Sequence, residues 1–393
     1  MSKNILSKAK NQFIYSLSNK KYLDFIISSG AMIFGHSPVF LVKKLRKQLS
    51  YGTNFSSNSY SEEKYKKLLN KTFKNYNNFI FSNSGSEANI RAIRIVRAIS
   101  NKRKIAIFSG SWHGSIDTTL VEEYNNKKIS ISSGVIKDNN IIILSSNDFK
   151  KSKKKIEKFS NDLAGVFFEP VQGSIPNKKN LENVKKLILL CKKKKILTCF
   201  DEIITGGRVT DITISNKLKI KPNILVLGKI FGGGFPIGIT CVDKYVSKKI
   251  DNLKKPIFFG GTFSGNVFTT EAGYLTLNYL LTNKNSLQNH LKKLVNELTK
   301  AVNSFLEKNQ KNMRLINYES IIRVIFTRKM VFSKKDRDIY DRNLINTKKL
   351  IFFLKQKNIL ITKTGGIFLC KSHTLSDIRR LAKALISFAI KHR

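Results

Sequence analysis

Cysteine, tryptophan, acidic residues and long apolar runs are all scarce in this sequence of 393 residues. The four cysteines are scattered and form no C-x-x-C pair, which argues against a zinc site and for reduced cysteines in the core. No apolar run is long enough to span a bilayer, and residues 1–10 lack the apolar core of a signal peptide. We therefore expect a cytoplasmic protein with no metal site and no membrane contact.

Acidic side chains number only 26 against 72 lysines and arginines, which gives a formal net charge of +46. Such an excess suggests nucleic-acid binding. However, most of the excess is lysine, which is enriched together with asparagine, isoleucine and phenylalanine, residues that share A/T-rich codons. No zinc finger, RNA-recognition signature or interleaved aromatic platform is present. We expect no specific nucleic-acid partner, only loose attraction to polyanions at low salt.

Short apolar runs alternate with helix-like stretches between residues 78 and 245, and they predict a mostly parallel α/β sheet that is covered on both faces. These runs are 78–82, 104–108, 141–144, 163–168, 196–200, 224–227 and 237–242. Further on, the pattern predicts helices over 266–308 and 337–357, strands at 319–327, 358–362 and 366–370, and a last helix after Ser376. We predict a large domain over 40–275 and a smaller α+β domain formed by 1–39 and 276–393.

Polar residues follow the first two runs. Ser84, Gly85 and Ser86 place hydroxyls and backbone amides at a helix start, which suits an anion but equally suits an ordinary capping box. Trp112 and His113 lie in a glycine-flanked turn after the second run. The tryptophan can cover a flat ligand, or it can be a wedge that packs the loop down.

Charged residues follow three later runs: Glu169, Asp201 and Lys229. Lys229 lies between a buried strand and three glycines, where a desolvated amine can attack a carbonyl; alternatively, it only extends to solvent from a strand end. Ligands of open parallel sheets bind outside the carboxyl ends of the strands, so these residues are expected to meet. An anion site, a flat-ring cover, a buried acid and a reactive lysine together fit one cofactor, pyridoxal 5′-phosphate.

The same segments resemble the class III (ω-type) aminotransferases, and within them most resemble the glutamate-1-semialdehyde 2,1-aminomutases, over nearly the whole chain. The matching segments are SGAMIFGH at 29–36, NSGSEA at 83–88, WHG at 112–114, DEIITGGRV at 201–209, GKIFGGG at 228–234, GTFSGN at 261–266 and SHTLSDI at 372–378. The resemblance implies the fold type I of pyridoxal-phosphate-dependent transferases, and a transaminase or aminomutase acting on a small amino donor and a carbonyl acceptor.

Roles for individual residues also follow from the resemblance. It implies that Lys229 forms the internal aldimine and shuttles the proton, that Asp201 pairs with the ring nitrogen, and that Trp112 and Ile203 sandwich the ring. The cofactor site would further include His113 and the phosphate-binding Ser84, Gly85 and Ser86. Gly261 and Thr262 would come from the partner subunit of a homodimer with shared active sites.

Three departures from the aminomutase pattern surround the substrate rather than the cofactor. The N-terminal N-S-P-V-R-A element, with its arginine, is missing, Ser29 replaces a tryptophan, and Gly365 replaces a glutamate. Loss of a carboxylate clamp is a large change for a small acidic substrate. We therefore expect an aminomutase-like aminotransferase with another acceptor. The alternatives are a true glutamate-1-semialdehyde aminomutase of tetrapyrrole biosynthesis and a non-catalytic relative, against which the retained Lys229 and Asp201 argue.

Overall fold

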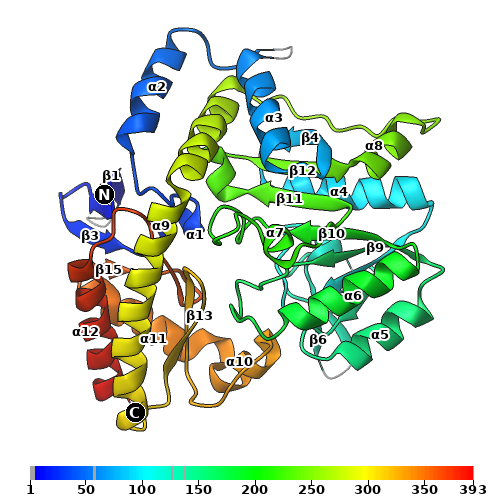
Figure 1. The fold of residues 1–393 in the computed structure, drawn as a ribbon. Helices are drawn as coiled ribbons and strands as arrows, with labels where there is room; N and C mark the ends of the chain where they lie inside the picture. Colours follow the sequence, from blue (N-terminus) through cyan, green and yellow to red (C-terminus); the bar gives the residue numbers. More distant parts are fainter. Residues whose placement is uncertain (1–4, 56–58, 125–126, 137, 393) are drawn as a thin grey trace.

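A seven-stranded sheet forms the centre of the computed structural model, which describes residues 5–55, 59–124, 127–136 and 138–392 (Figure 1). Its strand order is β4-β12-β11-β10-β9-β5-β8. Only β12 runs antiparallel to its neighbours, so the predicted mostly parallel sheet is confirmed. The strands are β4 (Tyr76–Ser82), β5 (Lys104–Phe108), β8 (Ile141–Leu144), β9 (Leu163–Phe168), β10 (Leu197–Asp201), β11 (Ile224–Gly228) and β12 (Gly238–Asp243).

Both faces of this sheet are buried, which explains why its strands are continuous apolar runs. Ile105 and Ile107 of β5 pack in one cluster with α4, whereas Ala106 and Phe108 of the same strand belong to the cluster that contains α6. Alternate residues of a strand point to opposite faces, so both sets must be apolar. The covering helices are α3 (Tyr60–Thr72), α4 (Gly85–Ser100), α5 (Phe149–Lys158), α6 (Leu181–Lys193) and α8 (Lys244–Asp251).

The N-terminal segment and the C-terminal part of the chain lie side by side (Figure 1). Strands β1 (Leu6–Lys10), β2 (Phe13–Ser16) and β3 (Lys21–Asp24) form a sheet whose fourth strand is β15 (Ile359–Leu360), parallel to β3. A second, antiparallel sheet contains β13 (Arg314–Tyr318), β14 (Ile321–Ile325) and β16 (Gly366–Phe368). Helices α10 (Lys334–Tyr340), α11 (Ile345–Gln356) and α12 (Leu375–Lys391) belong to this part.

The predicted helix over 337–357 is wrong as a single element. It is divided into α10 and α11 by the 3-10 turn Arg342–Leu344, where Asn343 and Leu344 have φ angles of 53° and 57°. The Asp341 carboxylate accepts hydrogen bonds from the amides of Asn346 and Thr347, so it caps the new start. Strand β13 was not predicted, because its buried and exposed residues do not alternate strictly.

The helix expected over 266–308 is present as α9 (Val267–Lys308), a single helix of 42 residues. It contacts α3 beside the central sheet and α12 at the other end of the molecule, so it joins the two parts (Figure 1). The predicted domain boundary at 275/276 falls inside α9, and the division into 40–275 against 1–39 and 276–393 stays a prediction.

The remaining elements are mostly short. They are α1 (Ile27–Gly30), α2 (Val39–Leu49), η1 (Asp117–Thr119), the hairpin β6 (Val121–Tyr124) and β7 (Lys127–Ser130), α7 (Ile214–Leu218) and η2 (Lys229–Gly232). Across the described ranges, no helix combines the length and the apolar character needed to cross a bilayer.

Candidate active site

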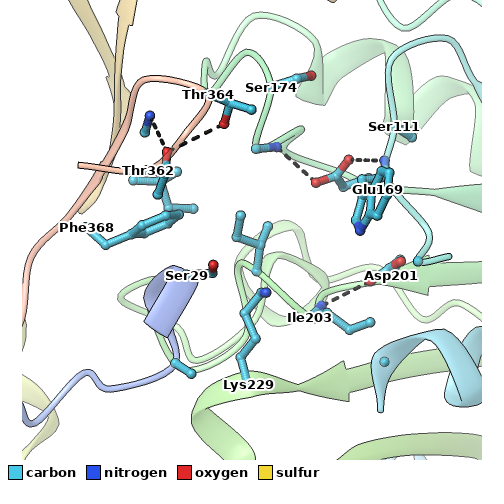
Figure 2. Close-up of a pocket in the computed structure, with 18 of the residues that line it drawn as sticks. Ser29, Ser111, Glu169, Ser174, Asp201, Ile203, Lys229, Thr362, Thr364 and Phe368 are labelled. Atoms are coloured by element: carbon cyan, nitrogen blue, oxygen red, sulfur yellow. Dashed lines mark hydrogen bonds between the residues drawn. The ribbon is translucent and has the colours of Figure 1, made fainter. Parts of the chain in front are cut away.

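A cavity of about 900 Å³ opens at the carboxyl ends of the parallel strands (Figure 2). Asp201 ends β10, and Lys229 directly follows β11, its hydrogen-bonded parallel neighbour. Both residues line the cavity together with Ile203, Glu169 and Trp112. The charged strand ends singled out in the sequence therefore meet in one place, as the topology of a parallel sheet requires.

Asp201 is held rigidly at the bottom of this cavity. It is 2% exposed, and one of its carboxylate oxygens accepts hydrogen bonds from Asn89 Nδ2 and His113 Nδ1, both at 2.8 Å. The other oxygen accepts the backbone amide of Ile203 at 3.1 Å. Three donors compensate the cost of burying the carboxylate. The aspartate is therefore a fixed, oriented hydrogen-bond acceptor.

Lys229 begins η2 in a conformation that is unusual for lysine. Its φ angle is 48°, in the left-handed region that non-glycine residues rarely adopt. Its side chain extends into the space between Ile203 and Ser29 (Figure 2). Burial lowers the pKa of Lys229, and the carboxylates of Asp201 and Glu169 oppose part of that decrease. The lowered pKa increases the fraction of unprotonated, nucleophilic amine at neutral pH.

Glu169 is a second buried carboxyl group in the wall of the cavity. Its two oxygens accept the backbone amides of Gly173 at 2.9 Å and Trp112 at 3.0 Å (Figure 2). Burial raises the pKa of Glu169 to about 7, although these hydrogen bonds favour the carboxylate. The sequence had placed this residue at a strand end, but the predicted site did not include it. The group titrates near neutral pH and fixes the loop that carries Trp112.

The start of α4, where the sequence predicts an anion site, has unpaired backbone amides among the described residues. No group among the described residues accepts the backbone amides of Gly85 and Ser86. A Cβ atom on Gly85 would lie 2.4 Å from Ile203 Cδ1, so glycine is required there. Ser84 lies outside the cavity lining, because its hydroxyl accepts the Glu87 amide as the helix N-cap. Ser84 is therefore the helix cap, while Gly85 and Ser86 face the cavity, and the anion site stays a prediction.

Trp112 and Ile203 both line the cavity, where they can lie on the two faces of a flat ligand. Trp112 is 57% exposed, so it does not pack its loop tightly against the protein, which was the alternative interpretation of the sequence. His113 is 2% exposed and lies outside the lining; it acts through Asp201, and its Nε2 atom has no partner among the described residues. Gly261 and Thr262 also lie outside the lining, on an exposed loop.

The opposite wall of the cavity was missed by the sequence analysis. It is formed by the small antiparallel sheet and α10, and its charged residues are Arg323, Lys334 and Arg337. Thr362, Thr364 and Phe368 complete this side (Figure 2). The sequence contains one indication of this wall, because Arg323 interrupts the apolar run Ile321–Ile325 and arginine is rarely buried unless a partner pairs with it. Ser29 lines the cavity as well, whereas Gly365 does not.

Comparison with known sequences gives a family for the chain. The model of the family described as Aminotransferase class-III matches residues 1–377. Glutamate-1-semialdehyde 2,1-aminomutase of Wigglesworthia glossinidia brevipalpis is 30% identical over 377 residues, which cover 93% of this chain and 83% of the relative. The protein of the same name from Clostridium perfringens (strain 13 / Type A) is 29% identical over 391 residues, 98% of this chain and 92% of the relative.

Solved structures with the same fold include several transaminases. A β-phenylalanine aminotransferase from Variovorax paradoxus has a TM-score of 0.87 at 26% identity, over 98% of this chain and 87% of that one. A glutamate-1-semialdehyde aminomutase from Pseudomonas aeruginosa, solved in complex with PMP, has a TM-score of 0.88 at 18% identity, with the same coverage of both chains. The predicted fold of pyridoxal-phosphate-dependent transferases is confirmed.

Proposed function

This chain belongs to the class III aminotransferase family, and we propose that Lys229 and Asp201 perform its pyridoxal 5′-phosphate-dependent amino transfer. One observation carries the proposal: an amine and a triply hydrogen-bonded carboxylate end neighbouring parallel strands and line one cavity. When bound, the cofactor supplies an electron sink for negative charge on the carbon beside the amino group. The family and its curated relatives support the general class of the reaction, an aminotransferase that resembles glutamate-1-semialdehyde aminomutase.

The residues on the sheet side suit this cofactor. The amides of Gly85 and Ser86 at the start of α4 would hold the phosphate, helped by the partial positive charge of a helix N-terminus. Asp201 would hold the proton on the ring nitrogen, since Asn89 and His113 orient its carboxylate. Trp112 and Ile203 would cover the two faces of the ring.

Lys229 would have two tasks. Its amine would bind the cofactor aldehyde covalently and, once displaced by an amino donor, would remove the proton from the donor's α-carbon. Both tasks require unprotonated Nζ, which burial favours by lowering the pKa of Lys229. The same atom would return the proton at the next step, so no other general base is needed within reach.

Borohydride trapping tests the assignment of the lysine. We expect purified protein loaded with the cofactor to be yellow and to lose its absorption band on borohydride treatment. The reduced cofactor should then be found covalently attached to Lys229, which is the label that we score. The matched control is Lys334, which lines the same cavity but is paired with Glu122 and Asp338. Lys334→Ala protein should be labelled as wild type is. If Lys229→Ala protein forms the same reducible adduct, the assignment is wrong.

A second candidate function is a true glutamate-1-semialdehyde 2,1-aminomutase, which the names of the 30% and 29% identical relatives favour. Formation of 5-aminolevulinate from glutamate-1-semialdehyde without any second substrate would identify it. An intermolecular aminotransferase would instead need a separate amino donor and a carbonyl acceptor. A protein that binds the cofactor but turns over none of a panel of donors would be a non-catalytic relative.

The functional unit that we propose is a homodimer in which Gly261 and Thr262 complete the phosphate site of the partner subunit. Both residues are exposed, and the flanking Phe258 and Phe263 are 80% and 61% exposed. Exposed aromatic side chains of this size are typical of surfaces that another chain covers. Sedimentation equilibrium of the purified protein tests this: a monomer at micromolar concentration would contradict the shared site.

We place the enzyme in the cytoplasm. The four cysteines are free and buried, as expected for a protein in a reducing compartment. Fractionation of cells, followed by detection of the protein, tests this placement.

A further inference from the structure

The cavity wall opposite Lys229 carries a cluster of cations. Arg323 comes from β14, and Lys334 and Arg337 come from the first turns of α10. Arg323 donates to the carbonyl oxygen of Gly173, and Arg337 donates to the carbonyl oxygen of Ser174. Ser174 and Thr364 lie on the side of the cavity away from Lys229 (Figure 2). The cluster therefore lies across the cavity from Lys229, and Lys334 lies close to Gly110 in the loop that carries Trp112.

Arg323 differs from its two neighbours because it has no acidic partner. It is only 7% exposed, and its guanidinium donates to Gly173 O at 3.1 Å, to Thr364 Oγ1 at 3.1 Å and to the Thr364 carbonyl oxygen. In the described part of the chain, no carboxylate lies within 4 Å of it. A guanidinium has about five N–H groups, so roughly two remain without an acceptor. Burying such a charge without an anion is costly.

The pairing of the charges in this cluster indicates the kind of anion that it can bind. Lys334 pairs with Glu122 and Asp338, and Arg337 pairs with Asp338. Arg323 is therefore the one cation of the three that forms no ion pair with a carboxylate of the described residues, and Asp338 and Glu169 act on it only over a longer distance. A single carboxylate neutralises one charge, whereas a diphosphate would bring an excess of negative charge. Burial and the neighbouring Arg337 lower the pKa of Arg323 to about 9, which still leaves it charged at neutral pH.

We propose that Arg323 binds a carboxylate group of the substrate, at the end of the cavity away from Lys229. The inference rests on the proposed function, because it assumes that the substrate's amino or carbonyl group meets the cofactor at Lys229. The planar guanidinium can present its remaining N–H groups to both oxygens of a carboxylate.

Calorimetric binding to the cofactor-loaded protein tests the proposal without any turnover. The probes are the straight-chain monocarboxylates of two to six carbons and the neutral amides of the same lengths. We expect at least one carboxylate to bind wild-type protein roughly tenfold or more tightly than its amide. Arg323→Lys should weaken that preference, because an ammonium cannot form the two-oxygen contact, and Arg323→Met should abolish it.

Arg314→Gln is the matched control. Arg314 lies on the neighbouring strand β13, and its guanidinium contacts Met330 and the Arg328 carbonyl outside the cavity. This variant should keep the full preference for the carboxylate. If wild-type protein does not distinguish any carboxylate from its amide, or if Arg323→Met retains the preference, Arg323 only ties the two walls together and the proposal is wrong.

Two further measurements distinguish a folding defect, an incorrect role for Arg323 and a failure of the proposed function. Thermal unfolding of each variant identifies a folding defect; if Arg323→Met does not fold, Arg323→Lys and the comparison of acid with amide in wild type still decide. Borohydride labelling at Lys229 is measured on the same preparations. Labelled protein without carboxylate preference refutes only the role of Arg323, whereas unlabelled wild-type protein refutes the proposed function itself.

Discussion

Replacement of Gly114 by alanine should disturb the anion site more than its effect on the backbone alone predicts. Gly114 has a φ angle of +96°, and a Cβ atom there would lie 2.3 Å from Ser86 Oγ and 2.7 Å from Ser86 Cα. Gly134 has a similar φ angle of +79°, but its Cβ would meet nothing within 4 Å. The two glycines share the conformational cost of an alanine, and only Gly114 adds a steric clash.

The magnitudes follow from these two terms. A left-handed backbone costs an L-residue about 1–2 kcal/mol. Overpacking of a close contact adds about 1–3 kcal/mol. Gly134→Ala should therefore lower the free energy of unfolding by the first term only, and Gly114→Ala by the sum. Because both variants reduce the freedom of the unfolded chain equally, that effect cancels in their difference.

Urea unfolding of the two apoproteins measures the stability difference, and titration with pyridoxal 5′-phosphate measures its consequence at the site. Ser86 must move to relieve the clash, and it carries one of the two free amides at the start of α4. We expect Gly114→Ala to weaken cofactor binding by roughly five- to hundredfold, and Gly134→Ala to leave it unchanged. Equal unfolding energies and equal cofactor affinities for the two variants would refute the close packing of Gly114 on Ser86.

Three other perturbations test separate parts of the site. In Asp201→Asn protein, the new amide NH₂ group faces a hydrogen-bond donor, either Ile203 N or the pair of Asn89 and His113. The substitution should therefore cost about 1–3 kcal/mol of unfolding free energy and slow single-turnover amino transfer by about 10²–10³-fold. Wild-type values in both assays would contradict the role of Asp201. Glu169 has a pKa of about 7 in the folded protein, above its ordinary 4.5, so its contribution to stability is present below pH 4.5 and is lost as the pH rises to 7. In urea unfolding of the apoprotein, Glu169→Gln should remove on the order of 3 kcal/mol of this pH-dependent decrease in unfolding free energy. An unchanged pH dependence of the unfolding free energy would contradict the raised pKa. Phe258→Asp should convert the proposed dimer to monomer in sedimentation experiments, whereas Phe352→Asp, at a 66% exposed site on α11, should not.

The half of the site that faces the cofactor was predictable from the sequence because local patterns fix it. A buried parallel strand leaves its last residue at the carboxyl edge of the sheet, so Asp201 and Lys229 had to meet once the strand order was given. The helix start at Ser84 is fixed by a local hydrogen bond, in which the Glu87 amide donates to the Ser84 hydroxyl. Such signals extend over a few residues, and the sequence contains them directly.

The partners that hold Asp201 were harder to predict. Asn89 lies in a matching segment, but only the docking of α4 on the sheet brings its Nδ2 atom to the aspartate. The interruption between α10 and α11 was also hidden, because it depends on Asp341 capping the second helix and on two positive φ angles. No glycine or proline between residues 337 and 357 marks the break in the sequence.

The half of the site that faces the substrate depends on packing between distant segments. All five residues of β14 are buried, so the period-2 alternation that distinguishes the two faces of a strand is absent around Arg323. The guanidinium is directed by carbonyl oxygens at Gly173 and Thr364, which are 150 and 41 residues away in the chain. The motifs therefore indicate the general class of the reaction, whereas the cavity wall around Arg323 is arranged only by the tertiary structure.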